Sequence, residues 1–153
     1  MHWVTRKKLR IARAATVWLI RRFLDPAASF AFVDDDEAVV AAERAGAIGF
    51  HAKGARYPPV NAREQTAFEA LVEEHCPQDA ALVAMGRIGH DADRGGAGPQ
   101  VPEAAGLRMI SVSFPEVCSD DMQIVAKSEL LYDALYYTLG KRERGGGVQA
   151  SGK

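Results

Sequence analysis

The amino-acid sequence predicts a helix-rich α+β domain, with about six helices packed around one core and a small two-stranded element. Three observations lead to this fold class. Apolar residues recur at helical spacing through most of the chain. Only two short stretches, SFAFV and AIGF, have the character of strands. The 153 residues, 48% of them hydrophobic and 25% charged, are typical of one soluble globular domain.

Breaking and capping residues set the bounds of each expected element. Asp25-Pro26 ends the first helix, because the residue before a proline avoids helical backbone angles. Asp79 and Ser119 are good N-caps, and Gly46 and Gly140 are placed to end helices. The expected elements are a helix over 6–24, a strand over 29–33, a helix over 36–45, a strand over 47–50, a loop over 51–63, and helices over 63–75, 79–94, 103–112 and 119–140.

The chain is expected to form one domain over residues 1–139, followed by a disordered tail over 140–153. The tail sequence GKRERGGGVQASGK is rich in glycine and has almost no apolar residue to bury. The net charge is −1, and the two cysteines, Cys76 and Cys118, share no metal-binding spacing. Together with the absence of an apolar run of about 18 residues, this predicts a cytoplasmic protein without membrane insertion.

The first helix carries arginines on two sides. Projected at helical spacing, Arg6, Arg10, Arg13 and Arg21 fall on an outer basic face, whereas Arg22 falls among the apolar residues. A guanidinium in that position needs a partner. One interpretation is a structural ion pair with Asp133, or with Asp25. The other is that Arg22 faces a pocket and holds an anion. The sequence leaves both open.

The stretch GRIGHDAD, residues 86–93, predicts a second polar site. His90 and Asp93 are three residues apart, so they lie on one face of the helix expected there. Histidine and aspartate suit one divalent metal such as iron, manganese or zinc, and Glu69 and His51 could complete its ligands. The alternative is an ordinary surface hydrogen bond. The sequence shows no motif of nucleophilic catalysis, so no catalytic residue is assigned.

Six short motifs, taken in order, resemble the carboxy-terminal domain of the chromate-resistance protein ChrB. They cover about Trp3 to Tyr137 and read WVTR, WLIRRFLDP, GAIGF, GHDAD, PEAAGL and LYDALY. The resemblance implies a bacterial protein that accompanies a chromate efflux pump. Longer members carry an amino-terminal region linked to DNA binding and chromate-responsive regulation. That region is not in this sequence, which argues against direct DNA binding by this chain alone.

The chain departs from the family pattern at residues of metal-ligand or thiol type. Ala12 stands where an acid is usual, Thr16 where cysteine or serine is common, His51 where aspartate is usual, and Thr66 where a cysteine is expected. A metal or thiol site of the family would therefore be weakened or inactive in this copy.

Three functions follow as hypotheses. The first is an accessory or sensor protein that supports chromate efflux or its regulation by binding chromate or a similar oxyanion, with Arg22, Arg13 and Arg6 as ligands. The alternative is a metal-dependent redox or hydrolytic enzyme that uses Glu69, His90, Asp93 and His51. A nucleic-acid-binding protein that uses the basic face ranks last, because the net charge is near zero and no reading motif is present.

Overall fold

The computed structural model describes the backbone of residues 1–152 and the side chains of residues 1–144. It confirms the helix-rich α+β class, with three strands instead of two. Within the described residues, the strands are β1 (His2–Arg6), β2 (Ser29–Val33) and β3 (Ile48–Gly49). The helices are α1 (Ile11–Leu19), the π-helix η1 (Ile20–Leu24), α2 (Asp36–Arg44), α3 (Ala67–His75), α4 (Ala80–Ala92), α5 (Pro102–Ser111), the single turn α6 (Phe114–Val117) and α7 (Asp121–Gly152).

The sheet is parallel, with the order β2-β1-β3. Its central strand, β1, is the strand that the sequence analysis missed. Val4 pairs with Ala31 on one side and with Gly49 on the other. Because all three strands run the same way, their carboxyl ends meet at one edge, and the residues that follow them are brought together there.

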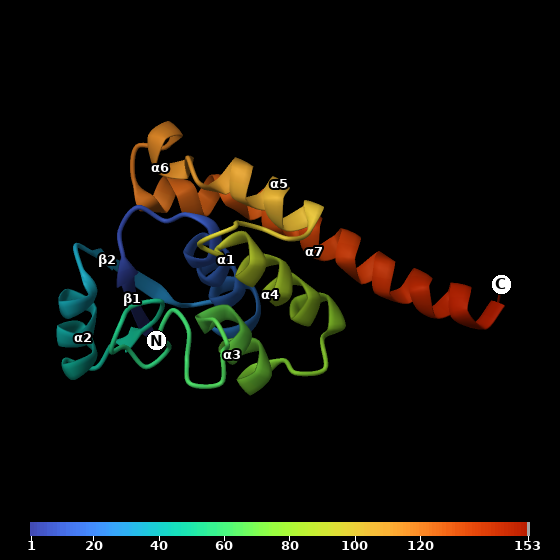
Figure 1. The fold of residues 1–153 in the computed structure, drawn as a ribbon. Helices are drawn as coiled ribbons and strands as arrows, with labels where there is room; N and C mark the ends of the chain where they lie inside the picture. Colours follow the sequence, from blue (N-terminus) through green and yellow to red (C-terminus); the bar gives the residue numbers. More distant parts are fainter. Residues whose placement is uncertain (153) are drawn as a thin grey trace.

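Helices cover both faces of this small sheet (Figure 1). On one face, α2 packs through Val39 against Val4, forming a small apolar cluster. On the other face, Trp3 and Phe50 join the main core, whose centre is α1. Every residue of α1 is buried, because α3, α4, α5 and α7 surround it. The expected single core is therefore divided by the sheet into two clusters of unequal size.

The first helix differs from its prediction at both ends. Residues 2–6 form β1, and the helix begins only at Ile11. Its last turns, Ile20–Leu24, form a π-helix, in which the backbone N–H of Asp25 donates to the carbonyl of Ile20. A π-helix winds less per residue than an α-helix, so a projection at constant angle fails there.

The last helix is longer than expected. It was predicted to end at Gly140, but α7 continues past this residue and extends away from the rest of the domain (Figure 1). Leu139, 2% exposed, is the last buried side chain among residues 1–144. The predicted tail falls largely on residues 145–153, whose side chains lie outside the described part of the chain, so its disorder stays a prediction.

Candidate functional site

Three polar residues, each at or after the end of one strand, meet at the carboxyl edge of the sheet. Arg6 is the last residue of β1, Asp36 begins α2 after a two-residue connection from β2, and His51 follows β3. We call these three residues the strand-end cluster. In open parallel sheets, ligands bind outside the carboxyl ends of the strands, at the point where the strand order reverses. Here the order reverses at β1, so the cluster occupies the place where that rule puts a site.

The strand-end cluster also contains all the buried side-chain polar atoms without a hydrogen bond in the described residues. They are Nε of Arg6, Oδ1 of Asp36 and both ring nitrogens of His51. The Arg6 and Asp36 atoms lie 3.0 Å apart, as an ion pair without the alignment of a hydrogen bond. Buried polar groups are nearly always hydrogen-bonded. The Arg6 and Asp36 atoms at least face each other, so the two ring nitrogens of His51 are the groups of this cluster that lack a partner.

His51 is the most buried member, with 6% of its surface exposed. Its backbone has φ of 56°, in the left-handed region that few residues other than glycine adopt. Burial, together with the positive charges of Arg13 and Arg6, lowers the pKa of the imidazole to about 4. His51 is therefore neutral near pH 7, with one ring nitrogen as a donor and the other as an acceptor.

Arg13 lies inside the protein, and its predicted place on an outer basic face is wrong. It is 8% exposed, because the loop after β1 folds over it. Its guanidinium donates to the carbonyls of Arg6 at 2.9 Å, Lys7 at 3.1 Å and Lys8 at 3.2 Å. Burial lowers its pKa to about 10, which leaves it a cation near pH 7. Arg13 thus fixes the loop and adds a buried positive charge near the strand-end cluster.

His90 and Asp93, predicted to share one ligand, have separate partners. Oδ2 of Asp93 lies 3.8 Å from Nε2 of His51. Burial raises the pKa of Asp93, against the lowering effect of Arg13 and Arg108. Nδ1 of His90 lies 2.7 Å from Oε1 of Glu69, and because a carboxylate only accepts, this nitrogen carries the proton.

Glu69 has a structural role at the start of α3. Its side chain accepts the backbone N–H of Thr66 at 3.0 Å, while the Thr66 hydroxyl accepts the N–H of Glu69, which is a capping box. Thr66, where the family resemblance implies a cysteine, is thus the N-cap of α3. Gly86 of α4 lets the two helices approach, because a Cβ there would lie 3.0 Å from Cγ of Glu69.

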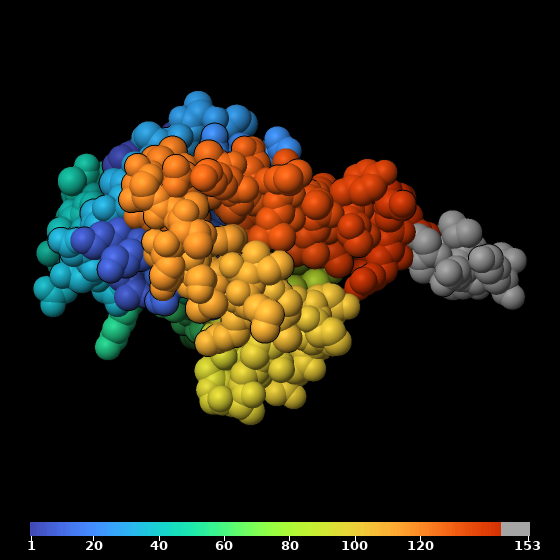
Figure 2. Space-filling model, turned by 90° about the horizontal axis from the view of Figure 1, so that it is seen from above, coloured from blue at the N-terminus to red at the C-terminus, as the bar shows by residue number. Residues whose placement is uncertain are grey.

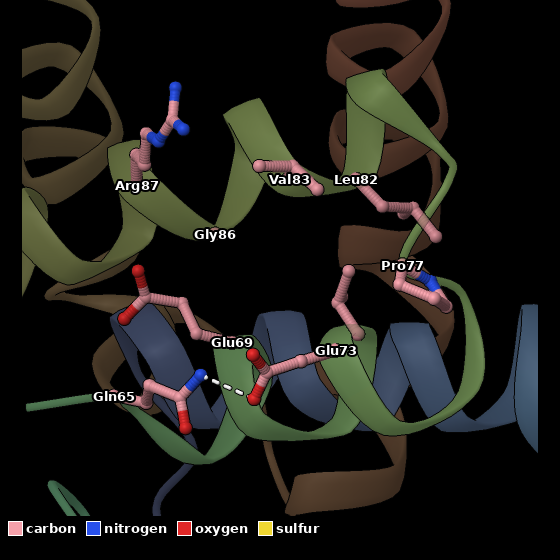
Figure 3. Close-up of a pocket in the computed structure, with 9 residues that line it drawn as sticks. Gln65, Glu69, Glu73, Pro77, Leu82, Val83, Gly86 and Arg87 are labelled. Carbon is pink, nitrogen blue, oxygen red and sulfur yellow. Dashed lines mark hydrogen bonds between the residues drawn. The ribbon is translucent and has the colours of Figure 1, made fainter. Parts of the chain in front are cut away.

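Glu69 also borders a cavity of about 330 Å³ between α3 and α4 (Figure 3). On the α3 side, Glu73 is held by Gln65 at 2.8 Å and by Arg63 at 2.7 Å. In Figure 3, Arg87 of α4 points away from both carboxylates. The acids of this cavity are therefore engaged with the protein's own groups, and the strand-end cluster remains the better candidate for a site.

Arg22 has partners of its own, away from those of Arg6 and Arg13. Its guanidinium bonds the carboxylate of Asp133 on α7, and Glu129 lies 3.9 Å away. The other oxygen of Asp133 accepts from Nε1 of Trp18 at 2.8 Å. Arg22 was expected within the apolar face, but its side chain is 49% exposed, because the π-helix turns it outward. The structure therefore gives the three arginines of the predicted anion site no common pocket.

The four predicted metal ligands form two contacting pairs, His51 with Asp93 and His90 with Glu69. Within the described residues, no group of three or more histidine, cysteine, aspartate or glutamate side chains is arranged to hold a metal. A divalent metal stays a prediction. In that part of the chain, no helix combines the length and the apolar character that crossing a bilayer requires.

Asp36 is the site residue that the sequence analysis missed. The acidic run Asp34–Glu37 directly follows the predicted strand over 29–33. Had residues 2–6 been recognised as a neighbouring parallel strand, the carboxyl-edge rule would have placed Asp36 beside Arg6.

Comparisons with known proteins agree with the resemblance seen in the motifs. A family model described as the C-terminal domain of ChrB matches residues 3–139. Protein ChrB of Cupriavidus metallidurans is 32% identical over 135 residues, which make up 88% of this chain and 39% of that relative. The chain thus spans about two fifths of the length of this curated relative. No solved structure matches it. The family match covers nearly the whole chain, and the chain therefore belongs to the family of ChrB C-terminal domains.

Proposed function

We propose that this chain is a cytoplasmic accessory or sensor protein of bacterial chromate resistance, and that it supports chromate efflux or its regulation by binding an oxyanion. Membership of the ChrB family supports the link with chromate. The proposed binding site is the strand-end cluster. The observation that carries it is that the buried side-chain polar atoms without a hydrogen bond, within the described residues, all belong to Arg6, Asp36 and His51, and that both ring nitrogens of His51 are among them.

The chemistry of the strand-end cluster suits a small tetrahedral anion. Chromate and sulfate need a positive charge and N–H donors directed at their oxygens. Arg6 offers its terminal nitrogens, for which no hydrogen bond is found within the described residues. Neutral His51 offers one ring N–H, and Arg13 adds its buried charge. Asp36 lies 3.0 Å from Nε of Arg6 and leaves the terminal nitrogens of the guanidinium to the anion.

This assignment uses two of the three arginines predicted to bind an anion. Arg22 is left out because it lies outside the strand-end cluster, where it pairs with Asp133 and Glu129 of α7. Arg13 acts as a positioning residue, because its donors hold the carbonyls of the loop after β1. Arg6 and His51 remain as the residues that contact the anion.

Equilibrium dialysis against chromate and against sulfate tests the proposal. We expect saturable binding near one anion per chain, weakened at least about tenfold in Arg6→Gln, because a charge-assisted bond is lost. Arg22→Gln is the matched control, since it removes the same charge from a position outside the cluster, and it should bind like the wild type. Unchanged binding by folded Arg6→Gln, or a loss confined to Arg22→Gln, contradicts the assignment.

We propose a divalent metal between His51 and Asp93 as a second candidate. The 3.8 Å between Nε2 and Oδ2 is shorter than the sum of two metal–ligand bonds of about 2 Å each, so one ion could touch both atoms. Elemental analysis for iron, manganese and zinc decides this. About one equivalent that is lost in His51→Asn supports the metal. Protein that binds chromate without metal, and takes up none when it is added, argues against it.

A further inference from the structure

Most of the exposed large apolar side chains among the described residues lie on or next to the helices α5, α6 and α7. Within residues 1–144, nine large hydrophobic residues are exposed, and seven of them lie on or directly before α5, α6 and α7. These seven are Val101, Met109, Ile110, Val117, Met122, Leu130 and Tyr137. Figure 2 looks onto these helices, whose side chains form one continuous surface. Single exposed apolar residues need no explanation, but a gathered set marks an interaction surface.

This surface contains a groove of about 570 Å³ between α5–α6 and α7. Most of the side chains that line it are apolar, and among them are Ile110, Phe114, Val117, Leu130, Leu131 and Ala134. Lys127 is the one charged residue of the lining. The groove therefore offers shape and apolar area, with little polarity that a ligand would have to match.

The exposed side of α7 continues the surface as a stripe. Met122, Ala126, Leu130, Ala134 and Tyr137 are all exposed and follow one another at intervals of four, four, four and three residues. This spacing places them along one face of the helix, as in a helix–helix seam. The opposite side of α7 is buried in the domain through Val125, Tyr132 and Leu139. Thus α7 has an outer apolar face with no partner among the described residues.

We propose that this face binds a second copy of the same chain, with the two α7 helices antiparallel and the two-fold axis near Leu130. Two observations favour a second copy. Leu130 lines the groove and is 77% exposed, so its side chain can contact the groove of a second copy in a self-complementary way, as an isologous interface requires. The antiparallel arrangement also brings the acidic start of α7 opposite the basic residues near 141–144 of the other copy, whereas a parallel arrangement does not.

The charge match follows from the sequence of α7. Two acids, Asp120 and Asp121, stand at its start, and the carboxylate of Asp121 also accepts the backbone N–H groups of Lys8 and Leu9. Residues 141–144 carry three bases, Lys141, Arg142 and Arg144, and one acid, Glu143. When Leu130 of one copy meets Leu131 of the other, Asp120 lies opposite Lys141 of the second copy. A parallel pair would set acids against acids and bases against bases. The antiparallel arrangement also opposes the two helix dipoles favourably.

Sedimentation velocity over a wide range of protein concentrations tests the dimer. We expect the wild type to dimerise, and Leu130→Glu to raise the dissociation constant at least about tenfold. Leu130 is 77% exposed, so this change should not disturb the fold, which circular dichroism will check. Val60→Glu is the matched control, because Val60 is 48% exposed and lies outside α5–α7. It should leave dimerisation unchanged.

A cysteine at the axis gives a second, independent readout. In a background of Cys76→Ser and Cys118→Ser, Leu130→Cys should form an interchain disulfide on mild oxidation, since a two-fold axis brings equivalent residues together. Val60→Cys in the same background should not. A wild type that stays monomeric at every concentration, or a folded Leu130→Glu that still dimerises fully, overturns the proposal. In either case the face binds a different partner or none.

Discussion

At the scale of single residues, His51 should make the stability of the domain depend on pH. Its pKa is about 4 in the folded protein and about 6.5 in an unfolded chain. Between these values the unfolded chain binds more protons, so stability falls as the pH drops from about 6.5 to about 4, by on the order of 3 kcal/mol. Above this window both states are neutral and the effect is absent.

Urea unfolding of the wild type and of His51→Asn, near pH 7 and near pH 5, measures this effect. Asparagine tolerates the left-handed backbone and does not titrate. Between pH 7 and pH 5, the free energy of unfolding should fall much less for the variant than for the wild type. Arg6, Arg13, Asp36 and Asp93 face His51 and stay in both proteins, so the difference isolates the imidazole. Equal slopes for the two proteins would show that His51 is not held neutral.

Two glycines of α4 should respond oppositely to alanine. A Cβ on Gly86 would lie 3.0 Å from Cγ of Glu69 and 3.3 Å from Cδ1 of Phe68. Glu69 cannot move freely, because it holds both the cap of α3 and His90. We expect Gly86→Ala to destabilise by about 1 kcal/mol, since crowding outweighs the gain in helix propensity. Gly89 has open space around it, so Gly89→Ala should stabilise by up to about 1 kcal/mol. Thermal unfolding tests this, because the melting temperature should fall in Gly86→Ala and rise in Gly89→Ala.

At the scale of elements, Asp133 should contribute more to the stability of the domain than Arg22, although the two form one ion pair. Arg22 is half exposed, so Arg22→Ala should cost no more than about 1 kcal/mol. Asp133 also accepts from the indole N–H of Trp18, which is 4% exposed. Asp133→Ala leaves this buried donor unpaired and should cost about 2–3 kcal/mol in urea unfolding. Asp133→Asn keeps an acceptor and should behave like Arg22→Ala. Equal losses in all three variants would contradict this division of roles.

The elements also show how far the sequence allowed prediction. Periodicity and breaking residues predicted α2, α3, α4 and α5, and Asp79 is the N-cap of α4, as predicted. Thr66, the N-cap of α3, was not predicted, and Asp120 caps the start of α7 in place of Ser119. Periodicity and capping residues could not predict the strand β1. Its five residues are flanked by exposed polar groups and have no turn signal, and the strand is stabilised by pairing with β2 and β3, which lie far along the chain.

The site was only partly predictable for the same reason. Arg6, Arg13, His51 and Asp93 were singled out by residue type and local spacing, yet assigned to separate anion and metal sites. Their proximity depends on β1 and on the fold of the loop over Arg13, which are tertiary features. Helical projection likewise misplaced Arg22, since a π-turn leaves no signal in periodicity.

At the scale of the whole molecule, the predicted boundary of the domain can be tested by truncation. Leu139 is buried and belongs to the main core, whereas residues 141–144 are exposed. A chain that ends at residue 144 should keep its stability within about 0.5 kcal/mol, because three consecutive glycines follow and favour no packed structure. A chain that ends at Thr138 loses Leu139 and should be about 2–3 kcal/mol less stable. Urea unfolding at one fixed protein concentration compares them, since dimerisation would make stability depend on concentration. A large loss on removing only residues 145–153 would show that the domain extends beyond its predicted end at 139.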